Sequence, residues 1–270
     1  MNVLIMTDIE GITNVDSYYA VWPETEEQRQ EAYRAREDLM RDVNAAVAGF
    51  FDAGADHVYV ADGHYAGKNF IHEMLDKRAE FIDRDVWESY VTERRVDIHA
   101  EVGSHAMAGT YNGFLDHSQS SNAWFDFKFN GRSYGEIFHS AAFVGAYDIP
   151  VVMVSGDVTA CEQARTLLGD IETAVVKRGV GRNKAISVPS EEARRRIYEA
   201  AKRSVALKDK IKPLKVHLPA VVTVTYMRTD FCDEAILSDK IHRTGPRTVE
   251  KYIDKIENFE DMLRMNAPRK

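Results

Sequence analysis

The feature of this sequence that most restricts its fold is the alternation of strand-like and helix-like segments over the first 180 residues. A short apolar run at Asn2–Thr7 is followed by apolar residues at helical spacing from Leu39 to Phe51, with Gly54 as the expected helix end. A second apolar run follows at Val58–Ala61. Because strands that alternate with helices pair in parallel, the sequence predicts an α/β protein with a mostly parallel central sheet flanked by helices.

The alternation continues along the chain with one interruption. Trp124–Phe129 alternates large aromatic with polar residues and precedes Asn130-Gly131, which is typical of a hairpin strand and its turn. Two more strands and two more helices are expected: the strands Val96–Val102 and Pro150–Ser155, and the helices Gly135–Tyr147 and Asp157–Leu168.

The last third of the chain has a different character. Leu207–Lys215 is rich in lysine and poor in apolar residues, so it is expected to be a connection. Val216–Tyr226 is rich in residues that favour strands, and two helices are expected after it. We therefore expect one domain over residues 1–270 with a smaller C-terminal α+β subdomain at 208–270, because no clear linker separates the two parts.

The charge balance excludes some classes of partner. The 270 residues include 35 basic and 43 acidic ones, which gives a formal net charge of −8. Proteins that bind nucleic acids or anionic membranes normally present a basic surface, so we expect neither partner. No apolar run approaches the roughly 20 residues that cross a membrane. Two cysteines, Cys161 and Cys232, fit a reducing compartment, so a cytoplasmic location is expected.

Polar side chains follow the predicted strands or begin a helix at four places. Asp8-Ile9-Glu10-Gly11 ends the first strand, and its two carboxylates are two residues apart and so face the same way. Carboxylates this close repel each other unless a cation or a proton lies between them. The other places are Asp62-Gly63-His64, where Asp62 could orient the imidazole or cap the loop, Gly103-Ser104-His105, and Gly135-Glu136.

The combination is more informative than any one motif. Ligand sites of α/β sheets lie beyond the carboxyl ends of the strands, and this edge collects five side chains that bind metals: Asp8, Glu10, His64, His105 and Glu136. Five such groups suit two divalent ions that share one carboxylate. Mixed imidazole and carboxylate ligands favour zinc, or manganese or cobalt, over magnesium or calcium. Paired ions about 3.5–4 Å apart lower the pKa of a water molecule and polarise a carbonyl group.

One further histidine, His117, lies in a predicted loop shortly after His105. Taken alone, His117 is either an ordinary surface-loop histidine or, beside two metal ions, a candidate catalytic residue that transfers a proton or stabilises an oxyanion. Lys177, Arg178 and Arg182 form a small basic group that is expected in a loop. There it could contact a substrate carboxylate, although solvated charge is the simpler interpretation.

In their order and spacing, these motifs resemble the bacterial D-aminopeptidases of the dipeptide-transport type, which are self-compartmentalising zinc peptidases. The resemblance spans nearly the whole chain. The matching segments are Met6 to Ile12, Asp62-Gly63-His64, Gly103 to Ala106, His117-Ser118, Gly135-Glu136, Asp148 to Asp157 and Arg243 to Glu250.

The resemblance implies a zinc-dependent aminopeptidase that hydrolyses short peptides with a free amino terminus, including peptides of D-amino acids. It implies that Asp8 bridges two zinc ions. Glu10 and His105 would complete the site of one ion, and the other ion would be held by His64 and Glu136. It also implies a homo-oligomer, a decamer of two stacked pentamers whose active sites face an internal chamber.

A phosphatase is one alternative. Residues Asp8 to Thr13 superficially resemble the nucleophile loop of the haloacid-dehalogenase-type phosphatases, and Gly156-Asp157 resembles their late acidic motif. In that chemistry Asp8 would accept a phosphoryl group with the help of magnesium. It leaves His64, His105 and Glu136 without a role.

A non-catalytic oligomer stabilised by metal is the other alternative, because the site and not the fold decides function. A structural metal site has no need of a free proton-transfer group. His117, which the resemblance makes the catalytic histidine, therefore favours the enzyme.

Overall fold

The main sheet of the protein, sheet A, has seven strands. The computed structural model describes residues 1–265. β9 pairs antiparallel with β8, whereas every other neighbouring pair of the sheet is parallel, which confirms the predicted architecture. In spatial order the strands are β3 (Glu80–Ile82), β2 (His57–Asp62), β1 (Asn2–Thr7), β4 (Ile98–Ser104), β7 (Val151–Asp157), β8 (Glu172–Gly181) and β9 (Lys184–Ser187).

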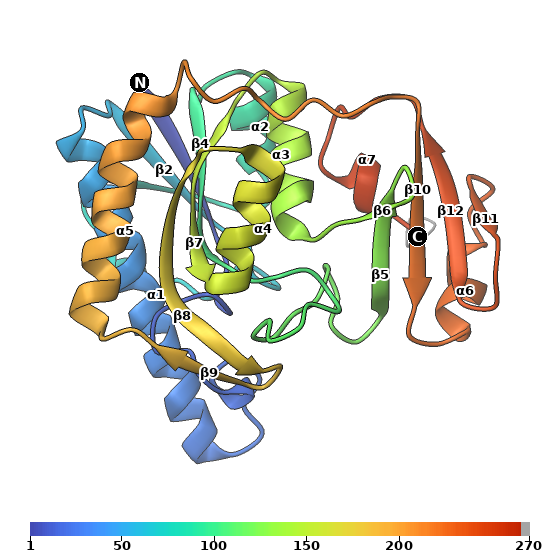
Figure 1. Ribbon diagram of the computed structural model, residues 1–270, viewed down its shortest axis with the longest axis horizontal. Helices are drawn as coiled ribbons and strands as arrows, with labels where there is room; N and C mark the ends of the chain where they lie inside the picture. Colours follow the sequence, from blue (N-terminus) through green and yellow to red (C-terminus); the bar gives the residue numbers. More distant parts are fainter. Residues whose placement is uncertain (266–270) are drawn as a thin grey trace.

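Helices cover both faces of sheet A (Figure 1). Alternate residues of β1 enter the two cores, since Val3 and Ile5 lie in one cluster and Leu4 in the other. One face carries α1 (Glu26–Asp52) and α5 (Ser190–Ser204), and the other carries α2 (Trp87–Thr92), α3 (Glu136–Ala146) and α4 (Val158–Leu168).

Local signals set the two ends of the longest helix, α1. The side chain of Thr25 accepts a hydrogen bond from the Gln28 N–H, and the side chain of Gln28 accepts one from the Thr25 N–H. Gly54 follows the last turn with a φ of +91°, as expected of a residue that stops a helix. The helix begins at Glu26, well before the apolar pattern that starts at Leu39. Its first turns are polar and largely exposed, so they show no apolar spacing in the sequence.

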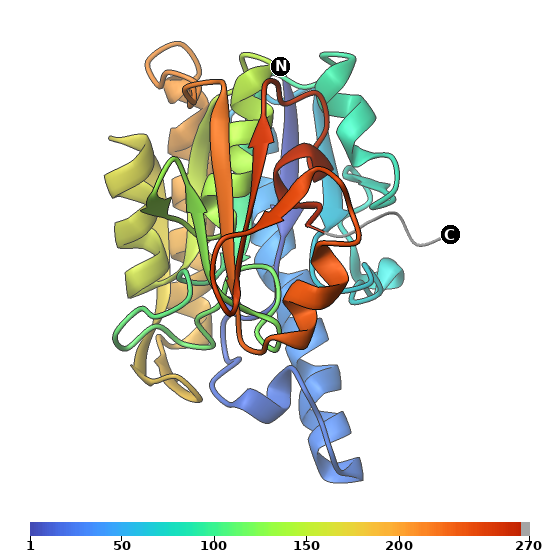
Figure 2. The same cartoon turned by 90° about the vertical axis from the view of Figure 1, so that its right-hand side faces the viewer.

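A second sheet, sheet B, is antiparallel and lies on the far side of α3 from sheet A (Figures 1 and 2). Phe127 and Val222 of this sheet share a core with Phe138 of α3. The C-terminal strands extend a sheet that starts at the predicted aromatic hairpin. Its order is β11 (Ile241–Arg243), β12 (Thr248–Ile253), β10 (Ala220–Tyr226), β5 (Trp124–Phe129) and β6 (Arg132–Ser133).

The two helices expected after β10 are present but short, and the sequence did not predict the strands β11 and β12, which lie between them in the described part of the chain. The strands were missed because their alternation is short and interrupted by charged residues. The short helices are α6 (Asp230–Ala235) and α7 (Glu260–Leu263), and single 3-10 turns occupy Tyr18–Ala20, His72–Met74 and Val205–Leu207.

The loop predicted around Lys177 is also wrong. Lys177 and Arg178 lie within β8, and only Arg182 lies in the turn to β9. Ala174 and Val176 point into the core from this strand, but charged neighbours obscure the alternation in the sequence. Lys177 is itself buried rather than solvated.

Within residues 1–265, no helix combines the length and the apolar content that crossing a membrane requires.

The strand order places the candidate ligands at one edge of sheet A. β1 lies between β2 and β4, so the chain reverses its direction of winding there. Thr7 at the end of β1 pairs with Asp62 on one side and with Val102 on the other. The loops after these three strands therefore start side by side, at the kind of switch point where α/β sheets bind ligands.

Candidate metal centre

Asp8, directly after β1, lies at the centre of the candidate site. Its two carboxylate oxygens face different histidines: Oδ1 is 2.9 Å from His64 Nδ1, and Oδ2 is 3.3 Å from His105 Nε2. The Asp8 N–H donates to the Val102 carbonyl of β4, which fixes the backbone here. One carboxylate thus lies between two imidazoles that come from different strand ends.

Asp8, Glu10 and His64 form the first group, and their ligand atoms lie within 4.8 Å of one another. Glu10 is 0% exposed, and its Oε2 lies 3.1 Å from His64 Nδ1. Neither carboxylate oxygen of Glu10 has a hydrogen-bond partner among the described residues. Because a buried carboxylate without hydrogen bonds is costly, this geometry fits a bound cation.

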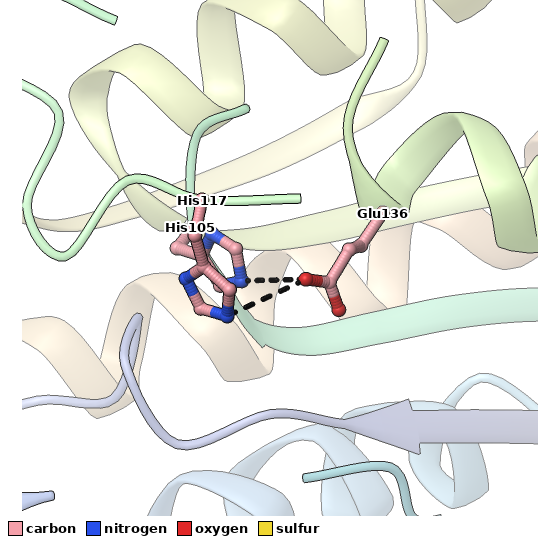
Figure 3. A group of neighbouring side chains, drawn as sticks. All are labelled: His105, His117 and Glu136. Carbon is pink, nitrogen blue, oxygen red and sulfur yellow. Dashed lines mark ion pairs between the residues drawn. The ribbon is translucent and has the colours of Figure 1, made fainter. Parts of the chain in front are cut away.

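His105, His117 and Glu136 form the second group (Figure 3). Glu136 Oε1 lies 3.3 Å from His105 Nε2 and 3.5 Å from His117 Nε2. Glu136 begins α3, whereas the two histidines come from the end of β4 and from the loop that follows it. The five predicted ligands and His117 therefore lie together, although Asp8 and Glu136 are 128 positions apart in the sequence.

Backbone carbonyls fix the tautomers of two histidines. His105 Nδ1 lies 2.9 Å from the Ala106 carbonyl oxygen, and His117 Nδ1 lies 2.7 Å from that of Leu115. Because a carbonyl oxygen only accepts, Nδ1 carries the proton in each neutral ring and Nε2 keeps a lone pair. Both Nε2 atoms face Glu136. Such a hydrogen bond on the far nitrogen is typical of histidines that bind metals.

The loop that carries His64 is held by Asp62. One Asp62 oxygen accepts from the His64 backbone N–H at 3.3 Å, and the other accepts from the Asn69 N–H at 2.6 Å. The Asn69 side chain also donates to Asp62 and to the His64 carbonyl. Of the two roles open to Asp62, the structure shows the capping of this loop.

Two glycines let the loops approach each other closely. The Gly11 N–H donates to the Gly103 carbonyl at 2.7 Å. Gly103 has a φ of +92°, and a Cβ atom there would lie 2.1 Å from the Asp8 carbonyl oxygen. A Cβ at Gly11 would lie equally close to the Ser104 carbonyl. No other residue type fits either position, so these glycines bring Asp8 against β4.

Sequence reasoning missed three residues that support the site. The Gln119 N–H donates to Glu136 Oε1 at 2.7 Å, and the Gln119 side chain contacts buried His139. Lys177 Nζ donates to the carbonyls of Glu10 and Val15 at 2.7 and 2.5 Å, which ties the loop after β1 to β8. These contacts depend on tertiary structure, and nothing in the local sequence signals them.

The buried groups shift one another's pKa values. Burial is the largest single effect and lowers the pKa of each imidazole, but the neighbouring carboxylates together outweigh it, with Glu10 first at His64 and Glu136 first at His105. Both histidine pKa values therefore lie well above the usual range. Burial, followed by the charge of Glu10, raises the pKa of Asp8 to about 8. Protons and metal ions would therefore compete for these atoms.

The donor set fits divalent transition metals. Carboxylate oxygens and imidazole nitrogens are ligands that zinc, manganese and cobalt accept. Besides the Glu10 oxygens, His105 Nε2 is buried without a hydrogen-bond partner among the described residues. A cation between these atoms would satisfy them.

Comparison with known proteins identifies the family. A family model described as D-aminopeptidase, Peptidase M55, matches residues 1–265. The chain belongs to this family. Its membership makes it a peptide hydrolase, and the resemblance deduced from the motifs is confirmed.

A curated sequence and a solved structure that match this D-aminopeptidase family member each cover almost the whole chain. A D-aminopeptidase of Bacillus subtilis (strain 168) is 28% identical over 270 residues, which are 98% of this chain and 96% of the relative. The solved structure of the "Zn-dependent D-aminopeptidase DppA from Bacillus subtilis, a self-compartmentalizing protease" matches with a TM-score of 0.89 at 27% identity. It covers 98% of this chain and 96% of its own, so the fold is the fold of that peptidase.

Proposed function

We propose that this protein is a zinc-dependent aminopeptidase that hydrolyses short peptides with a free amino terminus, including peptides of D-amino acids. One observation carries the proposal: the two oxygens of Asp8 face His64 and His105 separately, at 2.9 and 3.3 Å. A carboxylate placed in this way is suited to bridge two metal ions. Family membership and the zinc dependence of the solved relative support the metal and the reaction.

The grouping of side chains suggests which residues hold each ion. Glu10 and His64 would hold one ion together with Asp8, and Glu136 and His105 would hold the other. This grouping differs from the pairing that the motif resemblance implied, in which Glu10 went with His105. It follows the distances, because His64 Nδ1 is 3.1 Å from Glu10 and His105 Nε2 is 3.3 Å from Glu136. Such ions, when bound, polarise the peptide carbonyl and lower the pKa of a water molecule.

His117 would transfer the proton. Its Nδ1–H is held by the Leu115 carbonyl, so its Nε2 is free to accept a proton from the attacking water and return it to the leaving amine. Burial, followed by the neighbouring His105, lowers the pKa of His117, which keeps the ring neutral at neutral pH. Glu136 Oε1, 3.5 Å from Nε2, would stabilise the imidazolium that forms when Nε2 takes up the proton.

The same proposal includes the cellular context. We infer a single domain that assembles into a homo-oligomer, with a decamer of two stacked pentamers as the specific form, located in the cytoplasm. The self-compartmentalizing solved relative supports assembly into a closed particle. The two alternatives, a magnesium phosphatase using Asp8 and a non-catalytic metal-stabilised oligomer, find no support in the family match.

Metal content combined with a peptide panel tests the function. Elemental analysis of the pure protein is expected to give close to two transition-metal ions per chain, with manganese and cobalt as possible substitutes for zinc. The panel pairs D- and L-alanyl peptides with free and blocked amino termini, and hydrolysis is expected of the free D-peptides. Magnesium alone, or no metal, would contradict the two-zinc site. Equal cleavage of blocked peptides would contradict an aminopeptidase, and a strict L preference would contradict the assignment to D-residues.

A further inference from the structure

A cavity of about 340 Å³ adjoins the candidate metal centre. Asp8, His105 and Glu136 line it where it meets the centre, and it extends between sheet A and helices α2, α3 and α7, where Trp87 and Phe259 form part of its wall. Its volume falls in the range of about 300–1,000 Å³ that is usual for small-molecule sites. The cavity is therefore large enough to take a substrate side chain beside the reacting centre.

Carboxylates dominate the charged lining of this cavity. Beyond the candidate ligands, Asp85, Glu88, Glu101 and Glu260 line it, against one arginine, Arg84, among the described residues. The Arg84 guanidinium donates to two backbone carbonyls of the loop after β2. These hydrogen bonds hold the guanidinium against that loop. The wall is thus complementary to a cation.

Glu101 is a buried carboxylate in this lining with one oxygen that lacks a hydrogen bond within residues 1–265. It is only 5% exposed, and the Ser104 hydroxyl donates to its Oε2 at 3.0 Å. Its Oε1 is buried without a hydrogen-bond partner among the described residues. His99 Nε2 lies 3.7 Å away, beyond hydrogen-bond distance, and neither nitrogen of that ring has a partner there either. Glu101 belongs to neither group of candidate metal ligands.

A second cavity beside the candidate metal centre lacks the acidic lining of the first. It has a volume of about 180 Å³ and also touches His105 and Glu136, but Arg132 lines it and Glu136 is the one carboxylate among its described lining residues. The two cavities therefore offer different electrostatic environments to the parts of a substrate that flank the metal centre. An ammonium group would enter the larger one.

We propose that Glu101 binds an ammonium group on a substrate side chain, so that the enzyme prefers peptides with a lysine-like residue over peptides with a neutral residue of the same length. This inference rests on the proposed aminopeptidase function and specifies its substrate class. An incoming ammonium would donate to the Glu101 carboxylate, which is 5% exposed and whose one hydrogen bond among the described residues comes from Ser104. The apolar walls formed by Trp87 and Ile137 would contact the methylene stem.

A panel of dipeptides tests the inference on the zinc-loaded, full-length enzyme. It contains lysyl-alanine and alanyl-lysine, and the same peptides with norleucine in place of lysine, each in D and L forms. Because a hydrogen bond to a charged group is strong, kcat/KM is expected to be about 10- to 100-fold higher for the lysine peptide at one of the two positions. The preferred position identifies the substrate residue that enters the cavity. Calorimetric binding of free lysine and norleucine should show the same preference without turnover.

Glu101→Gln is the test variant, because it keeps the shape and the contact with Ser104 but removes the charge. It is expected to abolish the lysine preference, so that the kcat/KM values of the lysine and norleucine peptides become equal within about threefold. Glu191→Gln removes the same charge from exposed α5 on the other face of sheet A and should preserve the preference.

The outcomes distinguish a failure of the Glu101 inference from a failure of the proposed aminopeptidase function. Wild-type enzyme that cleaves lysine and norleucine peptides equally would overturn the role of Glu101 and leave the aminopeptidase function intact. A variant that loses activity equally on both would show that Glu101 is structural and would also overturn it. Wild-type enzyme that cleaves no peptide would instead refute the proposed function, and this inference with it.

Discussion

His105 and His117 stack face to face, with ring centroids 3.9 Å apart and planes 10° from parallel. His105 Nε2 lies 3.3 Å from both Asp8 and Glu136, whereas Glu136 is the one candidate carboxylate that forms an ion pair with His117 Nε2 among the described residues, at 3.5 Å. The His105 ring therefore lies between two carboxylates, and the His117 ring is stacked on the face of the His105 ring. In the proposed mechanism, the stack would hold the proton carrier His117 beside the candidate metal centre.

Replacing His117 should abolish turnover and leave metal binding intact. His117→Ala is expected to lower kcat by about 100- to 10,000-fold, the usual contribution of a general acid–base residue. Metal content after dialysis should match the wild-type protein, because the five ligands remain. His117→Phe provides the matched variant, since it keeps a ring to stack on His105 and has no proton to transfer. If His117→Phe were active, the residue would have only a packing role.

The bridging role proposed for Asp8 predicts an unequal loss of metal among the variants of the candidate ligands. Asp8→Asn should weaken both sites, because both of its oxygens face a histidine. Glu136→Gln should weaken one site and leave close to one tightly bound ion per chain. Zinc titration by calorimetry, with elemental analysis after dialysis, measures both. Two independent ions retained by Asp8→Asn would rule out the bridge.

The sequence predicted the parallel sheet, and the clustering of the candidate ligands at one of its edges, for one physical reason. Asp8, His64 and His105 each follow a short apolar strand, and parallel strands bring their carboxyl ends to the same edge. The local pattern of apolar strands followed by polar residues was therefore enough to predict that these side chains lie at one edge of the sheet. Lys177 was misplaced in a loop because its burial depends on two carbonyls of a distant loop. Glu101 showed no signal because the cavity that it lines is built from separate elements.

Gly103 should be intolerant of any side chain. Gly103→Ala would combine a positive φ of +92° with a Cβ 2.1 Å from the Asp8 carbonyl oxygen, so it is expected to cost about 3 kcal/mol or more of unfolding free energy and to weaken metal binding. Gly54→Ala is the matched control, with a φ of +91° and no atom within 4 Å of the added Cβ. It should cost only the backbone strain, about 1–2 kcal/mol. Urea unfolding of both variants measures the difference, and equal losses would show that the contact with Asp8 carries no cost.

Lys251 on β12 should make the protein more stable as the pH rises above 8. Its Nζ is buried and donates to the Arg264 carbonyl at 2.8 Å, and burial lowers its pKa to about 8. An unfolded lysine has a pKa of about 10.4. Between these values the unfolded chain binds more protons than the folded one, so the free energy of unfolding increases with pH. Below pH 8 both states carry the charge, and the penalty for burying it is constant.

Comparison with Lys251→Met isolates this contribution from other groups that titrate in the same range. The wild-type protein is expected to gain stability relative to the variant between pH 8 and 10, by at most about 1.4 kcal/mol per pH unit. Lys184→Met on β9 removes an exposed ammonium and should follow the wild-type curve. Urea unfolding at several pH values measures all three proteins. If wild type and Lys251→Met had parallel curves, the buried ammonium would have to keep an ordinary pKa, which would mean that water reaches it in the folded protein.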